Sequence, residues 1–346
     1  MQVLAGDIGG TKTMLAIAEV TQIEGTSGAL RIGLIESRRY DSPQYPGLSV
    51  ICLQFARDLQ RPLPDFAGFG IAGPVTDGRG QTTNLPWLVD ERDLERTLGI
   101  RSVSLVNDFH ALALGLPAVE PKHLVTLNEG APVPGGVWAL IGAGTGLGEA
   151  VSVMGPSGLR QVLSTEGGHT DFAPRNELEM GILRFLWQRH PDHVSYERIV
   201  SGDGLVAVAE ALSHITGVPL PVDVAHVIRY DRASAPAAVT EAAQDDPVCR
   251  SAVETFCSIY GAEAGNLALK TLPTGGVYVA GGIAPRMLGF LEDGRFRDAF
   301  LAKGRMRPLL EAMPVRVVLD PDAALLGAAA LAAREATLQP PIRRTL

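Results

Sequence analysis

The pair Asn107-Asp108 places a carboxylate where an apolar run ends and an Ala/Leu-rich run begins. Residues 103–106 have the pattern of a buried strand, and residues 109–112 have helical spacing. Ligands of open α/β sheets bind outside the carboxyl ends of the strands, so Asp108 is a candidate general base. Both residue types are also good helix N-caps, and this second interpretation stays open from the pair alone.

Two glycine-rich tips each join a pair of short apolar strands. The first lies between residues 1–5 and 12–20, and it consists of Gly6, Asp7, Ile8, Gly9, Gly10 and Thr11. The second lies between residues 137–141 and 149–154, and at its centre are Gly144, Thr145 and Gly146. Successive backbone N–H groups at such tips can bind phosphate, and Asp7 favours a magnesium ion held through water. Each tip alone is also consistent with a tight hairpin.

Further polar and glycine residues follow the second tip. Glu166 and His169 flank two glycines, and they could be zinc ligands, an acid/base pair, contacts to a hydroxylated ligand or exposed turn residues. We expect no zinc, because no other His or Cys stands nearby at ligand spacing. Glu197 begins another polar segment and is equally consistent with a solvated charge. Gly281-Gly282 follows an apolar strand and offers a flat surface for an adenine ring, or forms a common tight connection.

Length and composition describe a globular protein with two domains. The chain has 346 residues, of which 46% are hydrophobic and 20% charged. A net charge of −8 argues against nucleic acid or an anionic membrane surface as a partner. The longest apolar stretch, residues 323–333, is too short to span a bilayer. The three cysteines are odd in number and form no CxxC pair, so we expect reduced thiols and a cytoplasmic protein without a signal peptide.

The order of the expected elements is that of a ribonuclease-H-like half, present twice. The first half reads strand, strand, strand, helix, strand, helix, strand and ends at Asp108. The second half begins with the strand, tip and returning strand of residues 137–154. We expect a small α/β domain made of residues 1–115 plus 323–346 and a large α+β domain made of residues 116–322.

In their order along the chain, these motifs resemble those of the bacterial ATP-dependent glucokinase family. The resemblance covers nearly the whole chain and rests on residues 6–11, 107–109, 142–148, 166–169, 197–198 and 280–282. That family belongs to the actin, Hsp70 and sugar-kinase superfamily. The resemblance therefore implies an α/β fold of two ribonuclease-H-like (actin-like ATPase) domains flanking a cleft.

The resemblance also implies a role for each motif. Asp108 would accept the proton of the glucose 6-hydroxyl as that oxygen attacks the γ-phosphorus of ATP, giving glucose 6-phosphate. The other sugar hydroxyls would bind Asn107, Glu166, His169 and Glu197. Phosphates would bind Gly9, Gly10, Thr11 and the tip from Gly144 to Gly146, with Asp7 near Mg²⁺. The nucleotide would lie against Gly281 and Gly282.

Three properties of the whole molecule are expected with these roles. Sugar binding should bring the two domains together and exclude water, the competing acceptor. The helix N-terminus should keep Asp108 ionised near neutral pH. A homodimer is a further expectation that comes from the family alone.

Two other functions stay open from the sequence. The same polar set can hold several pyranoses, so the chain can be a kinase for another hexose or an N-acetylated amino sugar. It can also be a non-catalytic sugar-sensing regulator, although such regulators need a DNA-binding segment and the acidic charge fits DNA poorly. The related repressor/kinase branch carries a cysteine-rich zinc motif after its Glu-Gly-Gly-His segment, and residues 170–200 of this chain contain no cysteine.

Overall fold

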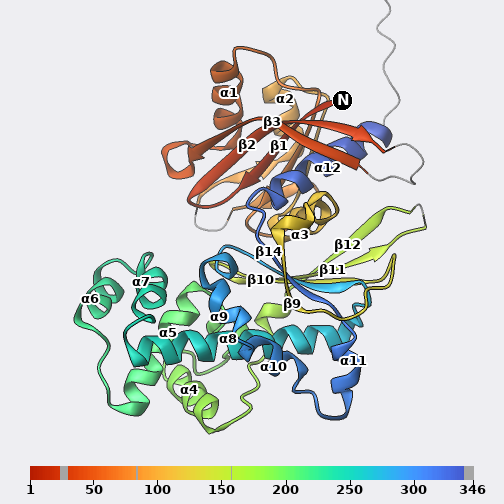
Figure 1. Cartoon of the computed structure of the whole chain (residues 1–346). Coiled ribbons are helices and arrows are strands. Elements are labelled where there is room, and N and C mark those ends of the chain that lie inside the picture. The colour runs from red at the N-terminus through yellow and green to blue at the C-terminus, as the bar shows by residue number, and fades with distance from the viewer. Residues whose placement is uncertain (24–29, 83–84, 157, 339–346) are drawn as a thin grey trace, which may run out of the picture. The chain divides into compact units, whose positions relative to one another are not determined.

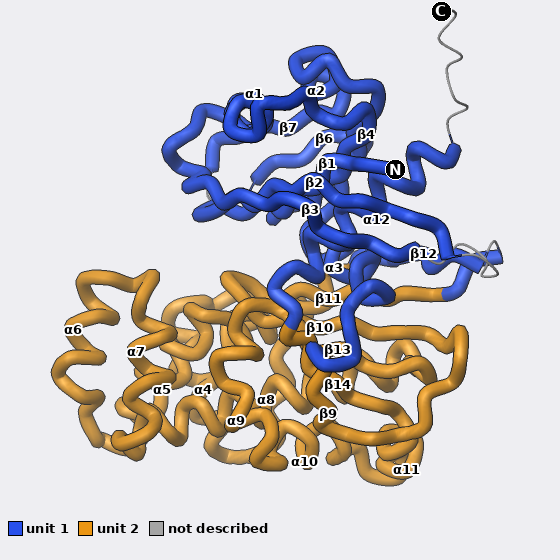
Figure 2. Tube along the Cα trace, turned by 45° about the horizontal axis from the view of Figure 1, so that its top comes forward, with its two compact units in different colours: residues 1–123, 154–164, 320–346 blue, residues 124–153, 165–319 orange. Residues whose placement is uncertain are grey.

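The computed structural model describes residues 1–23, 30–82, 85–156 and 158–338, and it divides into two compact units. Figure 2 shows the first unit, residues 1–123, 154–164 and 320–346, and the second, residues 124–153 and 165–319. Compact units are groups of contacting residues rather than segments shown to fold alone. The domains 1–115 plus 323–346 and 116–322 therefore stay a prediction, whose residues 339–346 lie outside the described part.

The first unit contains a five-stranded sheet with the order β3-β2-β1-β4-β8. Its strands are β1 (Gln2–Ile8), β2 (Lys12–Gln22), β3 (Leu30–Asp41), β4 (Phe66–Ile71) and β8 (Ser102–Asn107). The first three strands are antiparallel neighbours, while β1, β4 and β8 run parallel. This is the predicted ribonuclease-H-like arrangement. The carboxyl ends of β1, β4 and β8 therefore meet at one edge, where Asp7 and Asp108 lie.

Both faces of this sheet are buried by helices, which explains its nearly continuous apolar strands. Helices α1 (Leu48–Leu59) and α2 (Glu91–Leu98) cover one face, and α12 (Ala323–Leu338) covers the other (Figure 1). Alternate residues of β1 serve the two cores: Leu4 packs toward α1, and Val3 packs toward α12. The C-terminal helix thus completes a unit that begins at the N-terminus.

Helix α3 (Asp108–Gly115) is held by very close backbone packing against α12 and β4. A Cβ atom added to Gly327 of α12 would lie 1.6 Å from the Ala111 carbonyl oxygen, and one added to Gly115 would lie 1.9 Å from that of Ala323. A Cβ added to Gly70 of β4 would lie 2.8 Å from Ala111 Cβ. Because glycine alone permits these approaches, the three glycines set the position of the helix that begins with Asp108.

A small sheet in the first unit was not predicted from the sequence. It has the order β5-β6-β7, with strands β5 (Val75–Thr76), β6 (Arg79–Gln81) and β7 (Leu88–Asp90). Strands of two or three residues are too short to show a period-2 pattern. Short 3-10 turns also lie in this unit: η1 (Ser42–Gln44), η2 (Leu116–Ala118) and η3 (Pro121–His123).

The second unit repeats the arrangement of a hairpin followed by parallel strands. Its strands β11 (Leu147–Met154), β10 (Trp138–Ala143), β13 (Gly276–Ala280), β14 (Val315–Val318) and β9 (Leu124–Asn128) are neighbours in this order. The β10–β11 hairpin is antiparallel, and β10, β13 and β14 run parallel. Strand β12 (Arg160–Thr165) follows β11 in the chain and crosses the boundary between the two units. The predicted duplication of the ribonuclease-H-like half is therefore present.

Eight α-helices are described in the second unit, and they are α4 (Glu177–Trp187), α5 (Gly202–Thr216), α6 (Val222–Tyr230), α7 (Ala235–Ala242), α8 (Pro247–Thr271), α9 (Leu288–Glu292), α10 (Arg295–Leu301) and α11 (Arg307–Glu311). The long buried helix α8 begins at Pro247, because Asp246 caps it and proline suits the first turn. No helix in the described part of the chain has the length and apolar character needed to cross a bilayer.

Candidate active site

Asp108 is the first residue of α3, and its neighbour Asn107 is the N-cap. The Phe109 backbone N–H donates to Asn107 Oδ1 at 2.9 Å and to Asp108 Oδ1 at 2.8 Å. Asn107 Nδ2 donates to the Gly73 carbonyl oxygen at 3.1 Å. The capping interpretation is therefore correct for Asn107, and one of its amide hydrogens remains for a ligand. Because the helix is capped by Asn107, the Asp108 carboxylate is not needed for that purpose.

Asp7 and Asp108 are two largely buried carboxyl groups at the same edge of the first unit's sheet. Asp7 lies opposite Gly70 in the parallel register, and Gly70 lies opposite Val106 on β8. Burial, and next the charge of Asp7, raise the pKa of Asp108 to about 6 against the lowering effect of hydrogen bonds from backbone N–H groups and Asn107. Burial also raises the pKa of Asp7, which Lys12 opposes.

The helix N-terminus is not the dominant influence on the pKa of Asp108. Loss of hydration and the nearby Asp7 outweigh the helix dipole, so the pKa of Asp108 rises instead of falling. A pKa of about 6 still leaves this carboxyl group mostly ionised at neutral pH. It also gives the carboxylate more basicity than an exposed aspartate has, which suits proton acceptance.

Two hydrogen bonds from Ser42 hold the first glycine tip in place, and the Thr13 hydroxyl group lies behind Ser42. Ser42 Oγ donates to the Gly9 carbonyl oxygen at 2.9 Å, and the Ser42 N–H donates to the Thr11 carbonyl oxygen at 3.1 Å. Thr13 Oγ1 lies 2.9 Å from Ser42 Oγ, and both side chains are fully buried. Thr11 at the tip is exposed. Sequence reasoning missed Ser42, because it stands in a Pro/Tyr-containing segment that has no periodic pattern.

The second glycine tip, in the other unit, gathers the predicted nucleotide residues around it. The Gly144 N–H donates to the Gly146 carbonyl oxygen at 2.8 Å, and the Gly202 N–H, at the start of α5, donates to the Gly144 carbonyl oxygen at 2.9 Å. Gly281 has a φ of 86°, and a Cβ added there would lie 2.4 Å from the Ala143 carbonyl oxygen. Only glycine tolerates both the conformation and the contact. The Gly144–Gly146 tip and Gly281 therefore lie side by side.

The three predicted polar residues of the second unit also lie together. His169 Nε2 is 3.9 Å from Glu166 Oε2, and His169 Nδ1 is 3.9 Å from Glu197 Oε1. The exposed fractions of the Glu166, His169 and Glu197 side chains are 84%, 57% and 27%. Glu197 Oε2 accepts the Leu147 N–H at 2.9 Å, directly after the second tip. Glu197 thus connects the polar cluster to the glycine tip within this unit.

The chemistry of Asp7 is compatible with a magnesium ion. Oxygen is the ligand type that Mg²⁺ prefers, and one carboxylate plus water and phosphate oxygens completes its usual shell. Within the described ranges, no group of three or more His, Cys, Asp or Glu could hold a metal ion. A magnesium ion at Asp7 would therefore depend on the nucleotide for most of its ligands.

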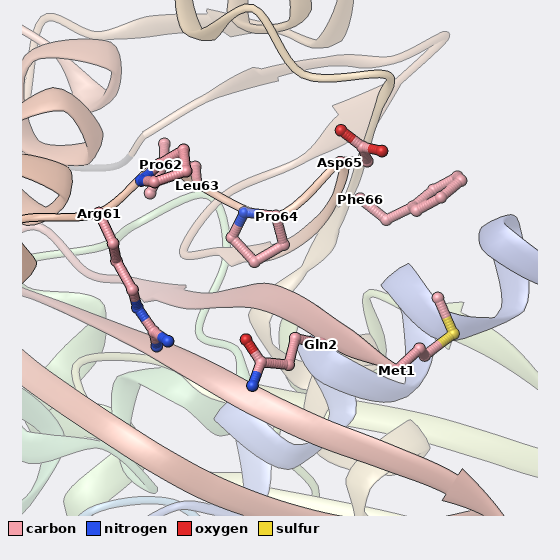
Figure 3. Close-up of a pocket in the computed structure, with 8 residues that line it drawn as sticks. All are labelled: Met1, Gln2, Arg61, Pro62, Leu63, Pro64, Asp65 and Phe66. Carbon is pink, nitrogen blue, oxygen red and sulfur yellow. The ribbon is translucent and has the colours of Figure 1, made fainter. Parts of the chain in front are cut away.

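A pocket of about 290 Å³ lies at the opposite edge of the first unit's sheet (Figure 3). Its lining comes from Met1 and Gln2, before and at the start of β1, and from residues 61–66, which lead into β4. Because β1 and β4 run parallel, this edge is the one away from Asp7 and Asp108. We assign no part of the active site to this pocket.

Comparison with known proteins identifies the family. The sequence profile described as Glucokinase matches residues 4–335. The glucokinase of Nostoc punctiforme is 40% identical over 343 residues, covering 96% of this chain and 98% of the relative. That of Synechocystis is 40% identical over 348 residues, covering 96% and 98%.

Solved structures agree with the described fold. A glucokinase from an Antarctic psychrotroph matches with a TM-score of 0.78 and 27% identity, covering 96% of this chain and 99% of that one. A glucokinase from Balamuthia mandrillaris, solved with glucose, matches with a TM-score of 0.75 and 19% identity, covering 96% and 93%. The latter likeness supports the fold alone. On the profile match and the near full-length relatives, this chain belongs to the glucokinase family.

Proposed function

We propose that this chain transfers the γ-phosphoryl group of ATP to the 6-hydroxyl of glucose, giving glucose 6-phosphate and ADP. The observation that carries the proposal is Asp108, a largely buried carboxylate with a pKa of about 6 at the carboxyl edge of the first unit's sheet. Membership of the glucokinase family supports the reaction type. A ROK family glucokinase from Streptomyces griseus, similar in fold, has been solved with glucose and AMPPNP, and this motivates ATP as the proposed donor.

Asp108 acts as the general base in this proposal. Its carboxylate accepts the proton of the 6-hydroxyl as that oxygen bonds to phosphorus and the bond from phosphorus to the ADP oxygen breaks. Phosphoryl transfer passes through a loose transition state, so the nucleophile gains little negative charge early and a modest base suffices. Asn107 holds α3 in register and offers its remaining amide hydrogen to a neighbouring hydroxyl.

Glu166, His169 and Glu197 bind the other sugar hydroxyls in this proposal. Each hydroxyl is both a donor and an acceptor, so a carboxylate and an imidazole can satisfy it in complementary ways. A sugar that lacks the matching hydroxyl leaves one of these groups unpaired, which is how such a site discriminates. The predicted domain closure is part of this proposal. Asn107 comes from the first unit and the other three residues come from the second, and all four are proposed to bind the same glucose.

The two glycine tips bind the phosphates, and magnesium accompanies the nucleotide near Asp7. Backbone N–H groups of Gly10 and Thr11 are proposed for one side of the polyphosphate. Gly6, Ile8 and Gly9 belong to the same strand and turn, and the Gly9 N–H donates to the Lys12 carbonyl oxygen at 2.9 Å. The Gly144, Thr145 and Gly146 tip is proposed for the other side, and Gly281 and Gly282 are proposed to line the adenine nucleoside. Magnesium would neutralise charge on the transferring group.

Location and assembly are further parts of the proposal. The described cysteines Cys52, Cys249 and Cys257 are free and buried, and burial raises the pKa of each thiol. Free thiols fit a reducing compartment, and we propose the cytoplasm. The homodimer stays a prediction.

The proposal is tested by a coupled assay of ADP release with magnesium and ATP against a panel of sugars. Glucose should give the highest kcat/KM among glucose, mannose, fructose and N-acetylglucosamine. Activity on another sugar alone would move the substrate and keep the reaction type. Glucose binding without turnover on any sugar would instead favour a sugar-sensing regulator and overturn the proposal.

The sugar subsite is tested separately by substitution. Glu166→Gln and His169→Ala should raise the KM for glucose more than the KM for ATP. The reverse pattern would mean that the sugar and nucleotide subsites have been exchanged.

Domain closure is tested by small-angle scattering. Saturating glucose should reduce the radius of gyration, and an unchanged value would exclude closure on sugar binding alone.

A further inference from the structure

Two buried carboxyl groups lie behind the polar cluster of the second unit. Glu149 of β11 is 3% exposed, and Glu263 of α8 is fully buried. Each has one carboxyl oxygen, Oε1, with no hydrogen-bond partner among the residues that the structure describes. The charge of Glu263 reaches Glu149 and raises its pKa, so ionisation of Glu263 disfavours ionisation of Glu149.

Glu149 lies directly against the turn that carries the predicted sugar contacts. A Cβ added to Gly167 would lie 1.9 Å from Glu149 Oε2, so the carboxyl group sits against the Gly167 backbone. The Gly167 N–H donates to Thr165 Oγ1 at 3.2 Å, and Thr165 Oγ1 donates to the Glu149 carbonyl oxygen at 3.3 Å. Gly167 begins the turn η4 (Gly167–His169). The Glu149 carboxyl group therefore packs directly against this turn.

The surroundings of the two carboxyl groups favour their protonated forms. Burial, and next the charge of Glu263, raise the pKa of Glu149 to about 7. Burial also raises the pKa of Glu263, although Asn266 Nδ2 donates to its Oε2 at 2.8 Å. The other titratable groups that face the pair are Lys270 and Tyr260 on α8, Tyr196 on η5 (Tyr196–Arg198) and Lys303.

Lys270 does not neutralise the pair completely. Its Nζ is 3.8 Å from Glu263 Oε1, beyond hydrogen-bond distance, and its side chain is 56% exposed. Lys303 Nζ donates instead to the Ala262 carbonyl oxygen and the Asn266 side chain. The positive neighbour Lys270 is near Glu263 and favours its negative charge, so Glu149 is the member of the pair that keeps its proton more readily.

We propose that Glu149 is a positioning residue for glucose, whose neutral carboxyl group supports Gly167 and thereby places Glu166 and His169 against the sugar. This inference rests on the proposed function, because it assigns a supporting contact to that sugar subsite. Ionised Glu149 needs water or a cation, and the exposed turn above it is the element that can move to admit water. Glucose binding should therefore weaken as Glu149 loses its proton.

The direction in which the glucose Kd changes with pH follows from the linkage between glucose binding and protonation of Glu149. If glucose binds only the form with neutral Glu149, its Kd rises as pH passes the pKa of about 7. Between pH 6 and pH 8 this amounts to roughly a tenfold rise in Kd. The KM for ATP should not share this rise, because the contacts of Glu149 are with the sugar turn.

The test compares Glu149→Gln with the wild-type chain by calorimetric titration of glucose at pH 6, 7 and 8. Gln keeps the shape and a donor but cannot ionise, so the variant should bind glucose with nearly wild-type Kd at pH 6. The glucose Kd of the variant should then rise less with pH than that of the wild type. At pH 8 the variant's Kd should be roughly tenfold lower than the wild-type Kd. Groups other than Glu149 contribute equally to both proteins. Glu241→Gln, at an exposed position of α7, is the matched control and should follow the wild type.

A second pair of variants tests the contact itself. Gly167→Ala should raise the glucose Kd, because its Cβ would lie 1.9 Å from Glu149 Oε2. Glu149→Ala should also raise the glucose Kd at pH 6, because it removes the group that supports Gly167, whereas Glu149→Gln should not. Equal pH slopes in wild type and Glu149→Gln, or a wild-type glucose Kd at pH 6 in Glu149→Ala, would overturn the inference. If the wild type neither binds nor phosphorylates glucose, the proposed function fails instead, so the two failures are distinguishable.

Discussion

Replacing Asp108 by asparagine should abolish most of the activity and at the same time stabilise the fold. The side chain keeps its size and can still accept the Phe109 N–H through Oδ1. Asn107 also caps that N–H at 2.9 Å, so α3 should remain in place. What disappears is the negative charge, and with it the ability to accept a proton from the sugar hydroxyl.

The loss in rate follows from the role of a general base. Removing such a group typically lowers the rate by about 10²–10⁴-fold, which corresponds to about 3–5 kcal/mol of transition-state stabilisation. The KM for glucose should change much less, because Asn107, Glu166, His169 and Glu197 are unaltered. The decrease should therefore be found in kcat.

The gain in stability follows from the pKa of Asp108. The folded value of about 6 lies above the ordinary 3.8, so holding this charge in the fold costs up to about 3 kcal/mol at pH 7.5. The cost is small at pH 4 and vanishes below the unfolded pKa of 3.8, where the group is protonated in both states. It develops as pH rises from 3.8 to the folded pKa of about 6 and is constant above that. Part of the gain is offset by burying the asparagine amide, which leaves about 1–2 kcal/mol.

The assay is thermal unfolding without magnesium or nucleotide, alongside kcat from ADP release. Asp108→Asn should raise Tm by a few degrees at pH 7.5 and by much less at pH 4. Asp58→Asn is the matched control, because Asp58 accepts hydrogen bonds from Tyr40 and Gln54 and its pKa is lowered. That control should keep full kcat and gain no stability. A near wild-type kcat in Asp108→Asn, or a lower Tm at pH 7.5, would refute the reasoning.

Two further predictions concern the elements that hold the site. Gly327→Ala places a Cβ 1.6 Å from the Ala111 carbonyl oxygen, so it should displace α3, lower Tm by several degrees and reduce kcat. Gly289→Ala is the control, because the space around Gly289 is open, and it should leave Tm and kcat unchanged. Ser42→Ala removes the hydroxyl that fastens the Gly9 carbonyl oxygen, and it should raise the KM for ATP by about five- to tenfold with little change for glucose. A larger change in the KM for glucose would contradict the assignment of that tip to phosphate.

Much of the framework was predictable because it depends on local patterns. The two strand-tip-strand motifs and the strand ending at Asp108 are visible as apolar runs bounded by glycines or polar pairs. Their pairing in the parallel part of each sheet follows from the ribonuclease-H-like order. The grouping of Gly281 with the second tip, by contrast, came from the family resemblance and not from a local pattern.

The supporting residues were not predictable in this way. Ser42 meets Thr13 and Gly9 only through the tertiary fold, and a lone serine in a segment without periodicity carries no signal for that contact. No local pattern marks Glu149 as buried, yet it is 3% exposed and lies near enough to Glu263 of α8 for that charge to raise its pKa. The direction of the Asp108 pKa depends likewise on burial, which no local pattern reports.

The most direct test of phosphoryl transfer from ATP to the 6-hydroxyl is phosphorus and carbon NMR of the products formed from magnesium, ATP and ¹³C-labelled glucose. The account predicts a phosphomonoester coupled to carbon 6 of glucose, formed in step with ADP and nearly absent with Asp108→Asn. Phosphate on a different carbon, or inorganic phosphate released without a sugar ester, would contradict it.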